Sequence, residues 1–226
     1  MKKTMFAVCA ALVMAVAFTS CSGKKGDDSS SKNETEKVKM LSHKKVPAYL
    51  KVEDYKSGTW VTDYNASIIP ENLTIPNGIA GIDDDTFKNC ELLESVKIPG
   101  SVKTIDVRSF MNCTSLASVA LAKGLEKIGG SAFENCTALK SITIPEGGVE
   151  IRGEAFEGCT ALAGVTIAKD VSEIGYNAFK SCTSLKEVRY KNTQKRFKLI
   201  ANKNAFEKDV VIHCTDGDYV FGSDAE

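Results

Sequence analysis

The sequence has few of the features on which catalytic, metal-binding or nucleic-acid-binding proteins depend. It holds 2 histidines in 226 residues, and its 29 basic and 29 acidic residues give a formal charge of zero. The lack of a basic excess argues against nucleic acid as a partner, because phosphate binding needs a basic face. There is no glycine-rich phosphate loop and no close cysteine pair of the kind that zinc requires. We therefore expect no cofactor, no metal and no nucleic acid.

Long hydrophobic runs are also missing. The longest, Met5 to Phe18, has 14 residues, whereas a membrane-spanning helix needs about 20. A run of this length after Lys2 and Lys3 is typical of a signal peptide. It ends in Phe18-Thr19-Ser20-Cys21, which resembles a bacterial lipobox, although Phe18 departs from the usual leucine. The resemblance implies cleavage before Cys21 and lipidation of Cys21; plain secretion with cleavage at another small residue is the alternative.

The segment after Cys21 is polar. Residues 22–32 contain no apolar side chain, so they cannot bury enough surface to offset the entropy of ordering. We expect residues 1–20 to be a lipoprotein signal peptide and residues 21–46 a flexible tether. Lysine and aspartate close to the cysteine resemble the surface-export signals of Bacteroidetes lipoproteins. The expected location is the bacterial outer membrane, lipid-anchored, at the cell surface.

The rest of the chain carries an internal repeat of 23 residues. Five cysteines recur at this interval, with a phenylalanine three residues before each and a leucine three residues after each. An isoleucine stands five residues before each phenylalanine. The cysteines are Cys90, Cys113, Cys136, Cys159 and Cys182. A repeat of this length is typical of a solenoid, in which stacked coils bury a continuous core that one coil could not form alone.

Each repeat can be interpreted physically. Ile142 and Ile144 alternate with polar residues, which predicts a short strand with one buried face, and Pro145 then ends the strand. The segment 130–136 begins with a turn signal and contains a small residue before an aromatic one, which predicts a short helical turn or loop. The sequence therefore predicts an α/β repeat solenoid with one short strand and one short helical turn per repeat.

The pattern A-F-x-x-C-x-x-L-x-x-V-x-I-P-x-x-V-x-x-I resembles the BspA-type, or treponemal, leucine-rich repeat. The resemblance covers five repeats over residues 75–189 and implies a right-handed coil. Gly148 departs from the pattern, and the neighbouring Val149 can replace the missing aliphatic side chain. Residues 47–74 are expected to form an N-terminal cap, and residues 190–226 an irregular last repeat with a C-terminal cap.

The cysteine column admits three interpretations. A ladder with 23-residue spacing does not make a tetrahedral zinc site. Disulfides are chemically open to a secreted protein, and neighbouring coils about 4.8 Å apart lie within disulfide reach. Side chains in one column point the same way, however, so we favour buried free thiols that act as small hydrophobic groups.

Other candidate sites are weaker. His213 and Cys214 are adjacent on a predicted strand and so point to opposite faces, which is a poor arrangement for a nucleophile and its base. The acidic runs 83–85 and 216–218 lack the ligand spread of a calcium loop and fit solvated turns. A group of basic residues in the last unit fits a solvated face or a patch for acidic glycans or lipid headgroups. These are Lys191, Lys195, Arg196, Lys198 and Lys203.

We therefore expect a non-catalytic, monomeric module that binds a protein ligand through the polar positions of its strand face. The resemblance implies adhesion to host extracellular-matrix or plasma proteins such as fibronectin and fibrinogen. A structural or assembly lipoprotein facing the periplasm is the alternative. The candidate binding face is Ser95, Lys97, Ser118, Ser141, Thr143, Thr166, Glu187 and Arg189. Five strands give a face of roughly 400 Å², half of the approximately 800 Å² that one partner of a standard interface contributes.

Overall fold

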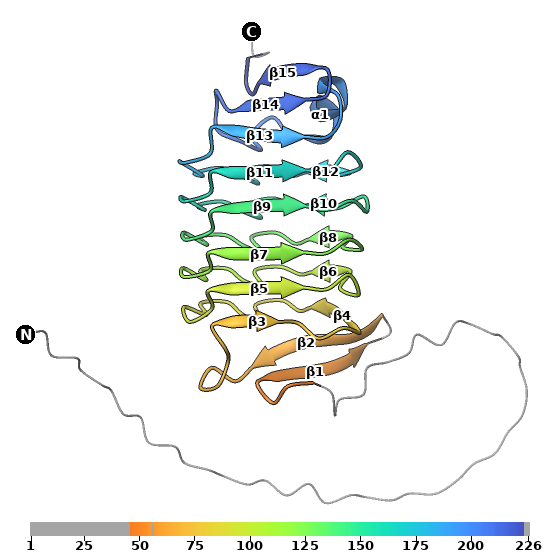
Figure 1. Ribbon diagram of the computed structural model, residues 1–226, viewed down its shortest axis with the longest axis vertical. Coiled ribbons are helices and arrows are strands. Elements are labelled where there is room, and N and C mark those ends of the chain that lie inside the picture. Colours follow the sequence, from red (N-terminus) through yellow and green to blue (C-terminus); the bar gives the residue numbers. More distant parts are fainter. Residues whose placement is uncertain (1–45, 56, 224–226) are drawn as a thin grey trace, which may run out of the picture. The chain divides into compact units, whose positions relative to one another are not determined.

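The computed structural model describes residues 46–55 and 57–223, so the predicted signal peptide, Cys21 and nearly all of the predicted tether lie outside the described residues. The described chain winds into stacked coils, with a row of short strands on each of two sides (Figure 1). One row contains eight strands in two sheets, and we call it the strand face. Its members are β3 (Asn72–Thr74), β5 (Ser95–Ile98), β7 (Ser118–Leu121), β9 (Ser141–Ile144), β11 (Gly164–Ile167), β13 (Glu187–Tyr190), β14 (Val211–Cys214) and β15 (Gly217–Val220).

The strands of successive coils pair in parallel with a constant offset of 23 residues. Val96 of β5 lies opposite Val119 of β7, and Val165 of β11 lies opposite Val188 of β13. These valines are buried, whereas residues that alternate with them, such as Lys97, face solvent. The predicted repeat solenoid with 23-residue spacing is therefore confirmed.

A ladder of aromatic rings forms the axis of the core. Phe110 and Phe133 stack with their ring centroids 5.1 Å apart and their planes 2° from parallel. Centroid spacings between 4.8 and 5.3 Å join the whole series of rings. The series consists of Tyr64, Phe87, Phe110, Phe133, Phe156, Phe179 and Phe206. Because each ring packs on the next coil, the burial of one coil depends on its neighbours.

The prediction of a helical turn in every repeat is wrong. The return segments are turns, in which residues such as Arg108 (φ 54°) and Asn112 (φ 60°) are left-handed and interrupt any helix. Their amides also bond to the next coil instead of along the segment: Phe110 N donates to Ala132 O at 2.8 Å, and Asn112 N donates to Glu134 O at 2.8 Å. Bonding between coils thus replaces the bonds that a helix would need.

A second row of strands, which was not expected from the sequence, lies on the opposite side of the coils (Figure 1). After the two strands of the N-terminal cap, this row has five strands, one for each isoleucine of the repeat. Four of these five contain only two residues, and each ends on that isoleucine, as at Ile105 and Ile128. Such strands are too short to give a pattern of alternation. They are β4 (Ile79–Ile82), β6 (Thr104–Ile105), β8 (Lys127–Ile128), β10 (Glu150–Ile151) and β12 (Glu173–Ile174).

An antiparallel pair closes the N-terminal end of this second row. β1 (Leu50–Tyr55) pairs with β2 (Gly58–Tyr64), and β2 pairs in parallel with β4. Val61 is fully buried, and Tyr64 lies 5.3 Å from Phe87, centroid to centroid. The indole of Trp60 covers Gly81, where an added Cβ would come within 2.5 Å of the ring. Glycine at 81 therefore permits this cap to sit close to the first coil.

The C-terminal end combines a helix with two strands. Within the described residues α1 (Gln194–Ile200) is the one helix; its Phe197 and Ile200 are buried. It takes up the extra residues of the last unit, so that Phe206 still stacks on Phe179 at 4.8 Å. β14 pairs with β13, and β15 pairs antiparallel with β14. The Asp218 and Val220 carbonyls of β15 accept bonds from Gln194 Nε2 and Ser223 N, which leaves less of this edge open to another strand.

The strand face is interrupted once. β7 belongs to the sheet of β3 and β5, and β9 begins the sheet that ends in β15, whereas β8 and β10 on the opposite side are paired across the same step. Pro145 has no N–H to donate to the Leu121 carbonyl, but Pro99 at the equivalent position leaves β5 paired with β3, so proline alone does not account for the interruption. In the next coil the corresponding bond, from Ala168 N to Ile144 O, is present at 3.2 Å. We call this step the seam.

Candidate functional site

The eight residues of the candidate binding face lie in two parallel columns on the strand face. Six of them are exposed, and Ser95 and Thr166 are half-buried. On one side of the seam Ser95 lies opposite Ser118. On the other side of the seam, one column consists of Thr143, Thr166 and Arg189. The second column consists of Ser141 and Glu187, with Gly164 between them. The backbone therefore brings the candidate residues onto one side of the molecule, in two groups.

The structure extends this face at both ends. At the N-terminal end Ser95 Oγ donates a 2.6 Å hydrogen bond to Asn72 Oδ1 of β3. At the C-terminal end β14, which was predicted as the closing strand of the cap, and β15 continue the face beyond the five strands of the repeats. Eight strands at about 4.8 Å give a face about 38 Å long and, with strands of at most four residues, roughly 500 Å² in area, which is nearer to the approximately 800 Å² that one partner of a standard interface contributes.

A charged cluster stands at the C-terminal end of the strand face. His213 Nδ1 lies 2.8 Å from Asp218 Oδ1, and His213 Nε2 lies 3.5 Å from Glu187 Oε2. Arg189 is the ladder partner of His213. The hydrogen bond with Asp218 raises the pKa of His213 above its usual value, and the charge of Glu187 adds to this effect. His213 and Asp218 were not among the predicted face residues: the strand of His213 was predicted only as part of the cap, and β15, which carries Asp218, was not predicted.

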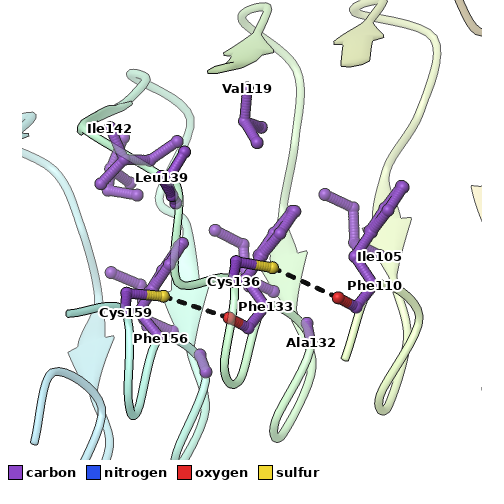
Figure 2. Packing of buried hydrophobic residues seen from close by; sticks show 14 of the residues in the cluster. Ile105, Phe110, Val119, Ala132, Phe133, Cys136, Leu139, Ile142, Phe156 and Cys159 are labelled. Atoms are coloured by element: carbon purple, nitrogen blue, oxygen red, sulfur yellow. Dashed lines mark hydrogen bonds between the residues drawn. The ribbon is translucent and has the colours of Figure 1, made fainter. Parts of the chain in front are cut away.

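The five cysteines of the column are buried and unpaired in the structure. The thiol of Cys136 donates to Phe110 O, and that of Cys159 to Phe133 O (Figure 2). Burial raises the pKa of Cys113 and of Cys182 to about 12. These groups are therefore held as thiols in contact with the neighbouring coil and do not open onto any described surface.

The pair of His213 and Cys214 has no geometry for nucleophilic catalysis. The imidazole of His213 contacts the carboxylates of Asp218 and Glu187. Cys214 is the last residue of β14, and burial raises its pKa to about 11. A thiol with so high a pKa is a poor nucleophile near neutral pH.

The acidic run 83–85 is used in contacts between coils. Asp85 forms two 2.8 Å hydrogen bonds with the guanidinium of Arg108, and this contact lowers the pKa of Asp85 well below its usual range. Asp84 Oδ1 accepts a bond from Val107 N at 2.7 Å. Over residues 46–55 and 57–223, no three histidine, cysteine or acidic side chains are placed to hold a metal ion together.

Of the basic residues of the last unit, Lys191 lies before α1, Lys203 lies after it and the other three lie on it. Lys198 Nζ lies 4.5 Å from the centroid of the Tyr219 ring, and Lys198 and Lys203 line a hollow beside it.

The part of the chain that the structure describes holds no helix that is both long enough and apolar enough to cross a bilayer.

The sequence matches the family model for the BspA type leucine rich repeat region, in 6 copies over residues 80–210. No curated protein matches the chain. Several solved structures are similar to it. The leucine rich repeat protein TpLRR of T. pallidum is 28% identical, with a TM-score of 0.59, and the match covers 64% of this chain and 70% of that one.

Two further structures are longer than this chain. A leucine rich cell surface protein of Faecalibacterium prausnitzii is 33% identical with a TM-score of 0.61; the match covers 66% of this chain and 40% of that protein. The pneumococcal vaccine antigen PcpA is 20% identical with a TM-score of 0.62, covering 73% of this chain and 41% of PcpA. PcpA therefore supports the fold alone, and this chain spans less than half of either protein.

The family model extends over more than half of the chain, and its repeats coincide with the paired coils. The chain belongs to the BspA-type leucine-rich repeat family.

Proposed function

We propose that this protein is a non-catalytic module that binds other proteins through its strand face, held at the outer surface of a bacterial cell by a lipid on Cys21. Membership of a repeat family with a solved cell surface relative supports an interaction role. The observation that carries the proposal is the series of exposed polar side chains on parallel strands that are paired on either side of the seam. Solenoids commonly bind partners on such surfaces.

The ligand we propose is a host matrix or plasma protein. The centre of the face carries small side chains such as Ser118 and Thr143, which allow close approach of a partner, and charge lies towards the ends at Lys97 and Arg189. A face of roughly 500 Å² favours weak binding by a single monomer. Many copies anchored side by side would raise the effective affinity through avidity.

Binding of the full-length protein to immobilised fibronectin and to immobilised fibrinogen tests this proposal. Lys97→Glu and Arg189→Glu should each weaken binding about fivefold or more, because charge reversal in an interface introduces repulsion. Lys169→Glu, which makes the same charge change at an exposed residue beyond the end of β11, is the matched control. Equal binding by all three variants would contradict the assignment of the face, and no binding to either protein would contradict the ligand.

Protease treatment of intact cells tests the location separately. Loss of the domain is expected if the anchored protein faces outwards. Protection of the domain would instead favour the structural or assembly role on the periplasmic side. Substitution of Cys21 by alanine should release the protein from the membrane fraction if the lipid anchors it.

A further inference from the structure

Two adjoining hollows lie at the C-terminal cap, away from the columns of the strand face. One, of about 330 Å³, is lined by residues that include Phe197, Lys198 and Tyr219. The other, of about 440 Å³, is lined by residues that include Lys180, Glu207 and Lys208. Both include Lys203, Phe221 and Gly222 in their lining, so the hollows form one continuous depression, which we call the cap trough.

The cap trough is rich in positive charge. Four exposed lysines line it, one from the last regular repeat and three from the segment after it: Lys180, Lys198, Lys203 and Lys208. Glu207 is the one carboxylate in the two linings, and its Oε1 already accepts a 2.9 Å hydrogen bond from Ser181 N. The excess of positive charge within a chain of zero formal charge favours an anionic ligand.

Aromatic rings form the floor of the trough and are held by the core. Phe221 lies 5.3 Å from Phe206 in an edge-to-face arrangement, and so is anchored to the end of the phenylalanine ladder. Tyr219 lies 6.5 Å from Phe221 and is half-buried beneath Lys198. Rings held in this way can contact the apolar face of a ligand while the exposed lysines contact its charges.

We propose that the cap trough binds an acidic polysaccharide, a chain whose sugar rings carry carboxylate or sulfate groups. Such a chain repeats its negative charges along its length, which matches lysines spread over two joined hollows. Its sugar rings have apolar faces that can lie against the exposed part of Tyr219, which packs on the buried Phe221. None of the lining cations is an arginine, the residue whose planar fork favours bidentate recognition of a single phosphate. This site would act independently of the strand face.

Binding of the full-length protein to heparin, to polygalacturonate and to neutral dextran tests the proposal. Heparin or polygalacturonate should bind, dextran should not, and affinity should fall as salt rises because the contacts are ionic. The two acidic polymers distinguish sulfate from carboxylate as the recognised anion. The double variant Lys198→Glu/Lys203→Glu should weaken binding about tenfold or more, whereas the control Lys140→Glu/Lys169→Glu should leave it unchanged. Equal loss in both double variants would show attraction by overall charge and would overturn the proposal.

A second pair of measurements separates a sugar ligand from an acidic peptide. Polyglutamate carries carboxylates without sugar rings, so it should bind more weakly than polygalacturonate. Tyr219→Ala should reduce binding of the polysaccharide about fivefold, and Tyr219→Phe should retain it, because the ring and not the hydroxyl contacts the sugar. Thermal unfolding of each variant verifies that the cap remains folded. If polyglutamate bound as well as polygalacturonate and Tyr219→Ala had no effect, the assignment to a polysaccharide would be wrong.

Discussion

The thiol of Cys136 donates a hydrogen bond to the carbonyl oxygen of Phe110 in the preceding coil, over 3.3 Å from sulfur to oxygen (Figure 2). The same bond recurs in three other coils, at 3.1 to 3.2 Å. Each phenylalanine carbonyl also accepts a bond from the cysteine amide three residues later, as Phe110 O does from Cys113 N. Cysteine suits this position because it is small and apolar yet retains a weak donor.

Removal of this sulfur should destabilise the solenoid. Cys136→Ala leaves a cavity in a closely packed core and deprives the Phe110 carbonyl of one donor, so the free energy of unfolding should fall by about 1–2 kcal/mol. Urea denaturation measures this change. Cys214→Ala, at a half-buried position at the end of β14, is the control and should lower the free energy of unfolding by less than about 1 kcal/mol. An equal cost at both positions would mean that the contact between coils contributes nothing specific.

The thiols of the column should resist alkylation in the folded protein. Burial raises the pKa of Cys113 and Cys182 to about 12, so roughly one in ten thousand of these two thiols is ionised at pH 8, and the thiolate is the reactive form. The other three column thiols are buried as well, out of reach of the reagent. Alkylation followed by peptide mapping should leave all five column cysteines unmodified until denaturant is added, and should then modify all of them. Cysteines that stay unmodified in denaturant without reductant would identify disulfides.

His213 should make the C-terminal cap sensitive to pH. Its hydrogen bond with Asp218 raises its pKa above the ordinary 6.5, so the folded chain favours the protonated form. The resulting stabilisation is fully present below about pH 6.5 and is lost as pH rises through the pKa of the folded protein. NMR titration should show the raised pKa, and Asp218→Asn should lower it more than Glu187→Gln does. A titration near 6.5 that neither substitution moves would contradict this pairing.

The sequence was sufficient for the repeat and for the strand face because both depend on residues that recur at a fixed interval. The one coil that departs from the pattern also keeps a buried aliphatic residue: Val149, next to Gly148, is fully buried as expected. Gly147 (φ 140°) and Gly148 (φ 73°) permit this, because they adopt backbone conformations that other residues avoid. The turn geometry could have been predicted from the asparagines, such as Asn112, which tolerate left-handed backbone.

Other features depend on contacts between distant parts of the chain and leave little trace in the sequence. The two-residue strands ending at Ile105 and Ile128 exist because the neighbouring coil supplies their partners. The link between His213 and Asp218 depends on β15 turning back along β14. The cap trough likewise joins Lys180 with Lys208 across the last unit. The two-residue strands recur with the repeat but are too short to show alternation, and the contacts of the C-terminal cap do not recur at all.

The seam should be the point at which the strand face opens most readily. In the coil after it, the amides of Gly164 and Ala168 donate back to the preceding coil, and Thr166 lies between them in the paired ladder of β9 and β11. Thr143 holds the equivalent place in β9, whose neighbour β7 belongs to another sheet. The amide of Thr143 should therefore exchange with solvent at least about tenfold faster than that of Thr166.

The two residues are identical in type and one repeat apart, so their intrinsic exchange rates contribute little to the difference. Native-state hydrogen exchange by NMR measures both rates in one sample, and equal protection would show that β7 and β9 are paired in solution. A faster rate at Thr143 would instead mean that the two halves of the binding face can move relative to each other while the paired strands β8 and β10 hold the opposite side together.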